Sequence, residues 1–262
     1  MSAVTHSHKT DFDALGFTLV EDVIPRDQLV ALREDLKRLW KRAKNKDIAS
    51  VRVYEDFPYF LGGVNVAGVE DPFVHTPMLA AWMPSSGLDQ ILADLTGWRG
   101  AELELARVHM NDRFKYQGFW HRDAKVEKAN SSVVAVIYFE DEEGFRITPS
   151  RNKYSAADLE LGDDMQKRHF QGPLQGEHIV TAPAGSVFFM KSYLLHRGYN
   201  NKPRLHLHTR FIEAPVTNAA GWAQYRNPVS PYDFGASKPA ARLRRLASYC
   251  IPRKDRSSLF QA

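Results

Sequence analysis

Residues 182–200, APAGSVFFMKSYLLHRGYN, decide how the rest of the chain is interpreted. A Pro-Ala-Gly turn leads into an apolar, aromatic run that is typical of a buried β-strand. The run ends at His196, just before a loop that contains glycine. Loops on a rigid scaffold are where functional side chains gather. The stretch therefore predicts a β-rich fold and places a candidate site residue at the end of one of its strands.

Other runs after Gly100 have the same character. Each is β-branched, aromatic or alternating, and each is bounded by Gly, Pro, Asn or Asp. They are ELELARVHM (102–110), SVVAVIYFE (132–140), EHIVTA (177–182), SVFFMK (186–191) and RLHLHTRFIEA (204–214). No helix-length pattern regularly separates them, which argues against a parallel βαβ sheet. We expect a mainly β protein with a double-stranded β-helix core (a cupin-like jelly roll) and N-terminal helices packed on one sheet.

The first hundred residues predict those helices. Residues 15–24 alternate well enough for a strand, and a helix is expected from Pro25 because leucines recur at spacings of three and four. These are Leu29, Leu32, Leu36 and Leu39. A second helix is expected near residues 86–96, with Gly97 as its terminator. Between the two helices, residues 50–84 are rich in Gly and Pro and predict loops and short strands.

Length and composition predict one domain. The 262 residues, of which 44% are hydrophobic, suffice for a single sizeable core. We expect one domain over 1–262, divided into an N-terminal strand and helix region with pocket-covering loops (1–100), a core that carries the site (101–214) and a C-terminal extension (215–262). No apolar run approaches the ~20 residues of a membrane helix, the N-terminus lacks a secretory signal, and the single cysteine fits a reducing compartment. These features predict a cytoplasmic protein with no membrane association.

The net charge of +4 is concentrated near the C-terminus. Residues 238–256 carry seven Lys and Arg side chains against one acid, Asp255. Such a cluster attracts phosphate or nucleic acid in some proteins. Here Leu243 and Leu246 supply an apolar side among the arginines, which favours a solvated amphipathic helix. We therefore expect no nucleic-acid partner.

A protein kinase is excluded despite two suggestive motifs. Residues 121–125 read HRDAK, and residues 233–235 read DFG. In a kinase the DFG follows the catalytic loop closely and a Gly-rich phosphate loop precedes both. Here 110 residues separate Asp123 from Asp233, no G-x-G-x-x-G occurs, and fewer than thirty residues follow the DFG.

The alternative interpretation of HRD is a metal site. His121-x-Asp123 is a short motif and weak by itself, but His196 lies 73 residues downstream of Asp123 with candidate strands between them. A jelly roll brings such strands face to face at one mouth of its barrel. Two imidazoles and one carboxylate leave open coordination positions, as in non-haem Fe(II) oxygenases. A structural zinc site would need four protein ligands and prefer thiolates.

The last strand supplies candidate anchors for an anion. Arg204 and Arg210 lie on the same face of residues 204–214 as His206 and His208, and the opposite face is apolar. A guanidinium binds a carboxylate through two charge-assisted hydrogen bonds. The polar face is therefore either an outer surface or the lining of a site, and alternation alone does not distinguish the two.

Several segments together resemble the phytanoyl-CoA dioxygenase family of Fe(II)/2-oxoglutarate-dependent oxygenases. They are GFTLVEDVIPRDQLVALREDL near the N-terminus, Trp120-His121-Arg122-Asp123, the loop from Glu143 to Ser150, the stretch from Pro183 to Asn200, and Lys202-Pro203-Arg204. The gap from His196 to Arg204 is a few residues shorter than usual in the family, and Arg151-Asn152-Lys153 replaces the usual end of the loop.

The resemblance implies a function and its residues. His121, Asp123 and His196 would bind Fe(II), and Arg204, with Arg210 in reserve, would bind the distal carboxylate of 2-oxoglutarate. With O2 these co-substrates would yield succinate and CO2 while a C–H bond is hydroxylated or otherwise oxidised. Since the carboxylate ligand is present, halogenation is not expected. The resemblance also places two further side chains near 2-oxoglutarate, with a core or hydrogen-bonding role as the alternative for each. They are Asn111 and Tyr138.

Two other functions fit the same residues. A cupin-type metalloenzyme that does not use 2-oxoglutarate would need a further ligand, for which His206 or His208 is available. A jelly-roll binding protein without catalysis would keep the fold alone. The expected partner in each case is a small molecule, and aromatic and basic residues in the flanking loops suit an anionic one.

Overall fold

The computed structural model describes residues 4–45, 67–70, 72–99, 101–111, 116–123, 132–150, 164, 168, 170–200 and 202–213. The helices in these ranges are α1 (His6–Leu15), α2 (Arg26–Lys44), α3 (Pro77–Ser85) and α4 (Leu88–Thr96), with a 3-10 turn η1 (Pro72–Val74). The strands are β1 (Phe17–Val20), β2 (Ala67–Glu70), β3 (Ala101–Asn111), β4 (Tyr116–Gln117), β5 (Ser132–Tyr138), β6 (Glu142–Ile147), β7 (His178–Ala182), β8 (Val187–Lys191), β9 (His196–Arg197), β10 (Tyr199–Asn200) and β11 (Arg204–Glu213).

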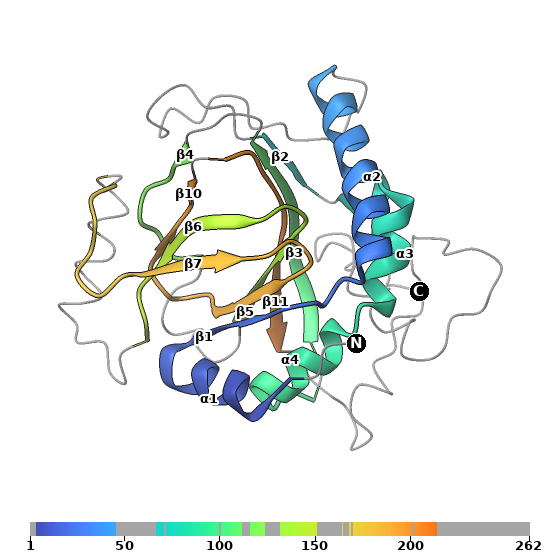
Figure 1. The fold of residues 1–262 in the computed structure, drawn as a ribbon. Helices are drawn as coiled ribbons and strands as arrows, with labels where there is room; N and C mark the ends of the chain where they lie inside the picture. Colours follow the sequence, from blue (N-terminus) through green and yellow to red (C-terminus); the bar gives the residue numbers. More distant parts are fainter. Residues whose placement is uncertain are drawn as a thin grey trace, which may run out of the picture.

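The strands form two main antiparallel sheets. The larger sheet has the order β1-β8-β5-β11-β3-β2 and the smaller has the order β7-β6-β9, while β10 and β4 form a separate pair. Figure 1 shows β6 and β7 on one side of the larger sheet and helices α2 and α3 on its other side. The mainly β jelly roll with N-terminal helices on one sheet is therefore confirmed.

Two hydrophobic clusters correspond to the two faces of the larger sheet. The cluster on the helix side contains Leu205, Leu207 and Phe211 of β11 together with the buried leucines of α2 and α4. The cluster between the sheets contains alternate residues of β5 and β8 with Phe145 and Ile147 of β6. Alternation along each strand thus supplies one apolar face to the helices and the other to the barrel interior.

The orientation of β11 follows from its partners. His206, His208 and Arg210 are in register with Tyr138, Val136 and Val134 of β5, and those three residues face the barrel interior or its wall. The polar face of β11 is therefore the inward one. This settles the question that the alternation of β11 left open.

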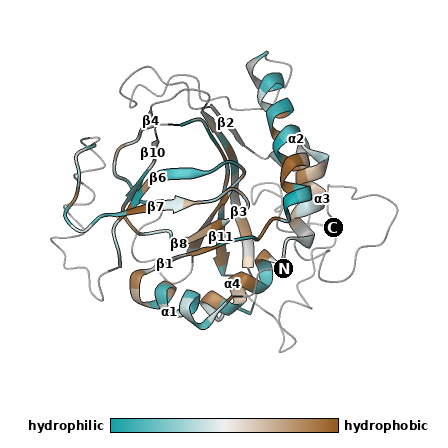
Figure 2. Cartoon of the chain, viewed as in Figure 1, coloured by the Kyte–Doolittle hydropathy of each residue, from teal (hydrophilic) through white to brown (hydrophobic). Residues whose placement is uncertain are grey.

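Local signals account for the helices. The Thr5 side chain and the His8 side chain cap the start of α1 reciprocally, and Gly16 ends it in the left-handed region with φ 83°. Helix α4 ends in the same way at Gly97, as predicted, with φ 74°. Helix α2 begins at Arg26 and buries its four periodic leucines, and in Figure 2 it carries both hydrophilic and hydrophobic colour along its length.

Three sequence-based expectations were wrong in detail. Residues 15–24 form a strand only over Phe17–Val20, because α1 extends to Leu15. The end of the stretch 50–84, expected as loops and short strands, instead belongs to helix α3 (Pro77–Ser85), in which Pro77 lies at the first turn where proline is tolerated. The segment from Glu143 to Ser150, taken as a loop, belongs as far as Ile147 to strand β6 (Glu142–Ile147).

Several expectations lie outside the described residues. These are the aromatic residues expected to wall the pocket, three of the basic residues expected around it, and the C-terminal extension with its basic cluster. They fall at Tyr54, Phe57, Tyr59, Phe60, Arg113, Lys125, Trp222, Tyr225, Arg226, Tyr232 and residues 238–256. Among the helices that are described, none combines the length and apolar character that crossing a membrane requires.

Candidate metal centre

Backbone pairing brings three distant residues together at one end of the barrel. His121 and His196 form an isolated antiparallel bridge, in which each backbone N–H donates to the carbonyl of the other at 3.0 Å. The backbone N–H of Asp123 donates to the carbonyl of Ser192 at 3.0 Å. Three main-chain hydrogen bonds thus fix where the side chains of His121, Asp123 and His196 begin.

The side chains of these residues converge. One ligand atom from each of His121, Asp123 and His196 lies within 4.8 Å of the others, which is a spacing that can hold a metal ion. The two imidazole centroids are 4.3 Å apart. Nε2 of His196 lies 3.4 Å from Oδ2 of Asp123. The three residues that the sequence singled out therefore form one cluster in space.

Hydrogen bonds set the tautomer of both histidines. Nδ1 of His121 lies 2.9 Å from the carbonyl oxygen of Phe119, and Nδ1 of His196 lies 2.9 Å from the carbonyl oxygen of Leu194. A carbonyl only accepts, so each Nδ1 carries a proton, and in the neutral ring Nε2 is then the nitrogen that offers its lone pair to a metal. Such second hydrogen bonds orient the histidine ligands of metal sites.

The electrostatics give the protonation states that a metal requires. Burial and the neighbouring His121 lower the pKa of His196 to about 4, although Asp123 opposes the shift. Burial alone would raise the pKa of Asp123, but His196, His208 and His121 together with Arg210 bring its net pKa well below the ordinary value. Near neutral pH the imidazole of His196 is therefore neutral and the carboxyl of Asp123 is ionised, which are the forms that coordinate metals.

Residues beside the two histidines hold their strands in place. Trp120 is fully buried, and its indole N–H donates to the carbonyl of Gly172 at 2.8 Å. The guanidinium of Arg197 lies 5.1 Å from the Trp120 ring centroid and donates to the carbonyl of Gln171. Because Trp120 precedes His121 and Arg197 follows His196, this cation–π contact clamps the bridge that carries both histidines.

The inward face of β11 continues the site into the barrel. Nη1 of Arg210 donates to the backbone carbonyl of Asp123 at 2.6 Å, and Nε2 of His208 lies 3.6 Å from Oδ2 of the same residue. The ring of His206 stacks on that of His109, with centroids 5.0 Å apart and planes within 9°. Sequence reasoning missed His109, although its alternation on β3 opposite His206 was a usable signal.

A second polar group lies further inside. Arg204 is buried and its Nε lies 3.0 Å from Oε2 of Glu142 on β6. The hydroxyl of Tyr138 and Nδ1 of His206 are buried, and within the described part of the chain neither has a hydrogen-bond partner. Asn111 pairs with Arg204 through the backbone of β3. Glu142 was not among the expected site residues, since nothing in its local sequence reveals which strand it faces.

Arg107 lies on β3 in register with His208. It therefore belongs to the inward face of that strand. Its charge contributes to lowering the pKa of both His109 and His208, so it lies close enough to the histidine group to influence it.

Comparisons with known proteins support the fold. No protein-family model matches this chain, and no curated protein matches it. Among solved structures it is similar to the non-haem alpha-ketoglutarate-dependent carbocyclase SnoK from nogalamycin biosynthesis, with TM-score 0.62, 13% identity, and coverage of 83% of this chain and 87% of that one.

Two further structures share the same architecture. EctD from S. alaskensis with bound Fe matches with TM-score 0.60 and 15% identity over 92% of this chain and 84% of that one. HygX from Streptomyces hygroscopicus, solved with nickel and 2-oxoglutarate, matches with TM-score 0.59 and 14% identity over 81% and 88% of the two chains. At such low identity the likeness establishes the jelly-roll fold.

Proposed function

We propose that this chain is a non-haem Fe(II)- and 2-oxoglutarate-dependent oxygenase that hydroxylates, or otherwise oxidises, an unactivated C–H bond of a small molecule. The observation that carries the proposal is the convergence of His121, Asp123 and His196 with both Nδ1 atoms engaged by carbonyls. Structural neighbours that bind iron, or nickel with 2-oxoglutarate, support the reaction class.

The donor set fits Fe(II). Two imidazoles and one carboxylate suit this ion, and three protein ligands on one face leave open positions for other groups. Within the described residues the cluster contains no thiolate, the ligand that would favour structural zinc. His121, Asp123 and His196 would hold the iron.

The interior of the barrel fits a dicarboxylate co-substrate. A buried guanidinium at Arg204 and a buried hydroxyl at Tyr138 that lacks a partner among the described residues are complementary to a carboxylate. We prefer Arg204 as the anchor because it is buried near the Tyr138 hydroxyl, whereas Arg210 is only half-buried and donates to the main chain of the expected metal ligand Asp123. Asn111, across from Arg204 in the register of β3 and β11, would border the same end of the co-substrate.

The residues of the chain provide position and exclusion of water. Bound together, Fe(II), 2-oxoglutarate and O2 would supply the oxidation of a C–H bond, with succinate and CO2 as products. The main chain of Asp123 is held by its own N–H, which donates to Ser192, and by Arg210, which donates to its carbonyl, so the backbone that carries the carboxylate is fixed before any metal arrives. Aromatic and aliphatic side chains between the sheets keep the interior dry.

The finer assignments are also proposals. The sequence resemblance supports membership of the phytanoyl-CoA dioxygenase family and a single domain whose core is residues 101–214. The intact carboxylate ligand supports hydroxylation, although neighbours include an epimerase and a carbocyclase. A small-molecule substrate is supported by HygX, which has been solved with hygromycin B. The low cysteine content supports a cytoplasmic location.

The first experiment measures ligand-dependent thermal stability. Under anaerobic conditions, Fe(II) and 2-oxoglutarate added together should raise the melting temperature more than either alone, because a ligand that binds only the folded state stabilises it. Asp123→Ala should lose this response, while Asp13→Ala, at an exposed carboxylate on α1 that pairs with Lys9, should keep it. A response to metal without any response to 2-oxoglutarate would favour the cupin-type metalloenzyme, and no response to either would favour a binding protein.

A further inference from the structure

A buried ion pair between the two sheets is not explained by metal binding. The side chains of Arg204 and Glu142 are 6% and 2% exposed, and they join β11 of the larger sheet to β6 of the smaller. Burying two charges costs free energy that their attraction only partly offsets. Apolar residues at these two positions would join the sheets with less penalty, so the retained charges suggest a role in binding.

Glu142 is held firmly by its own strand. Its Oε1 accepts a hydrogen bond from the backbone N–H of Phe145 at 3.1 Å, while Oε2 faces Arg204. A register shift between Glu143 and Phe145 turns the backbone N–H groups toward the carboxylate. Burial raises the pKa of Glu142, and the Arg204 guanidinium and the N–H groups of Phe145 and Gly144 oppose that shift. The carboxylate therefore remains beside Arg204 in the ligand-free protein.

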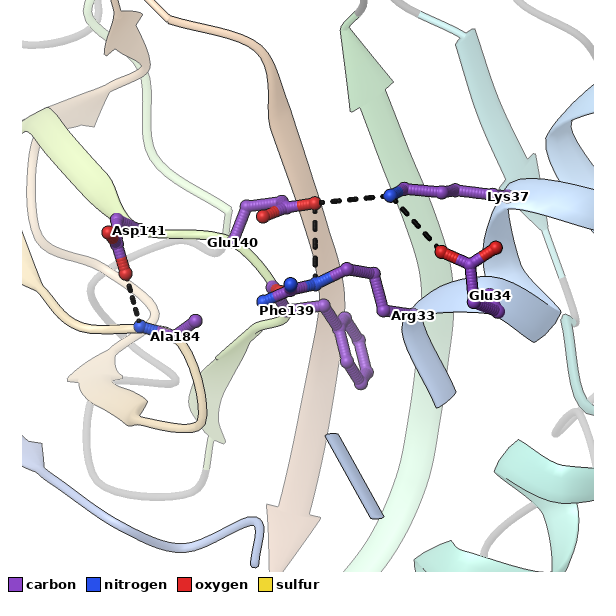
Figure 3. Close-up of polar contacts among 7 residues, drawn as sticks. All are labelled: Arg33, Glu34, Lys37, Phe139, Glu140, Asp141 and Ala184. Carbon is purple, nitrogen blue, oxygen red and sulfur yellow. Dashed lines mark hydrogen bonds and ion pairs between the residues drawn. The ribbon is translucent and has the colours of Figure 1, made fainter. Parts of the chain in front are cut away.

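The turn that carries Glu142 is also fastened from outside. Figure 3 shows Arg33 and Lys37 of α2 reaching the β5–β6 turn, where Nε of Arg33 donates to the carbonyl of Phe139 at 2.8 Å. Arg33 and Lys37 lie 3.3 Å and 3.7 Å from Oε1 of Glu140. On the other side of the turn, Oδ1 of Asp141 accepts from the backbone N–H of Ala184 at 2.8 Å. These contacts fix the turn from which strand β6 and the Glu142 side chain extend.

We propose that Glu142 is the internal counter-ion of Arg204 and weakens the binding of the 2-oxo acid co-substrate, whose distal carboxylate must share that guanidinium with it. The inference rests on the proposed function. Glu142 would be a specificity-determining residue, because it acts against a second anion at Arg204 and has no such effect on a neutral group.

Two physical effects predict the same response to Glu142→Gln, which keeps the shape and a hydrogen-bond acceptor but removes the charge. In the ligand-free protein, Arg204 loses the anion 3.0 Å from its Nε, so this state becomes less stable. In the loaded protein, repulsion between two carboxylates disappears. Both effects favour binding, and we expect affinity for 2-oxoglutarate to rise on the order of tenfold, which corresponds to about 1.4 kcal/mol.

The experiment compares Glu142→Gln with Glu143→Gln, its exposed neighbour that pairs with Lys202 at the surface. Calorimetric titration with 2-oxoglutarate in the presence of Mn(II), without O2, gives the affinity, and melting in the absence of metal and co-substrate gives the stability. Glu142→Gln should bind more tightly and melt lower than wild type, whereas Glu143→Gln should match wild type in both. Unchanged or weaker binding in Glu142→Gln would overturn the inference.

A second variant covers the case in which Glu142→Gln does not fold. Glu142→Asp keeps the charge but withdraws it by one methylene, so it should tighten binding by a smaller factor; equal or weaker binding would contradict the inference. If wild type does not bind 2-oxoglutarate at all, the proposed function fails and the inference fails with it. If wild type binds and neither variant binds more tightly, only the role of Glu142 is refuted.

Discussion

Replacing Tyr138 by Phe tests the interior site most directly, because it removes only the phenolic hydroxyl group. Tyr138 is 1% exposed, and its hydroxyl has no hydrogen-bond partner among the described residues. Burial raises its pKa well above the ordinary value; Glu142 adds to this and Arg204 opposes it. The phenol is therefore protonated and available as a donor to an anion.

The magnitude follows from the cost of an unsatisfied polar group. A buried hydroxyl without a partner costs about 1–3 kcal/mol, and phenylalanine fills the same volume without that cost. We expect ligand-free Tyr138→Phe to be more stable than wild type by about 1–2 kcal/mol, or a rise in melting temperature of roughly 2–4 °C for each kcal/mol. A lost hydrogen bond to a carboxylate, about 1.5–3 kcal/mol, should weaken 2-oxoglutarate binding by about tenfold or more.

Tyr193 provides the matched control. It is also buried, but its hydroxyl lies 2.7 Å from Oγ of Ser150. Tyr193→Phe breaks that hydrogen bond, so it should lower the melting temperature and leave co-substrate binding unchanged. Melting of the metal-free proteins and calorimetry with 2-oxoglutarate and Mn(II) measure both quantities. If Tyr138→Phe destabilises the ligand-free protein as Tyr193→Phe does, and binding does not weaken, the assignment of this pocket is refuted.

Three other predictions test different parts of the site. Asp123→Ala should abolish 2-oxoglutarate-dependent succinate release, and normal turnover in this variant would refute the metal assignment. Arg204→Met should abolish calorimetric binding of 2-oxoglutarate with Mn(II) while Arg210→Met retains it, and the reverse result would make Arg210 the anchor. Burial lowers the pKa of His109 and His206 well below 6.5, so the unfolded chain gains protons that the folded one does not. As the pH is lowered below about 6.5, the free energy of unfolding of the metal-free protein should therefore decrease by about 1.4 kcal/mol per pH unit for each histidine. The urea midpoint should decrease less steeply with pH in His206→Gln than in wild type. An identical slope in the two proteins would contradict the buried neutral state of His206.

Local sequence patterns predicted the elements that have strong local signals. The leucine spacing of α2, the glycine after α4 and the apolar alternation of five strands each reflect a short-range preference of the chain. Strand β6 escaped detection because EEGFRI combines three charges with a glycine and is stabilised by pairing with β7 and β9. Helix α3 escaped because its two prolines suggested a loop, whereas Pro77 occupies a position where helices accept proline.

The sequence by itself determined the kinds of side chain in the site and the two-faced character of β11. Only the tertiary structure decided that the face with Arg204, His206, His208 and Arg210 turns inward, that His121 pairs with His196, and that Glu142 meets Arg204. The physical reason is that alternation is a property of one strand, whereas the face that becomes buried depends on which sheet packs against it. Contacts between strands far apart in the chain leave no signal in the residues immediately around them.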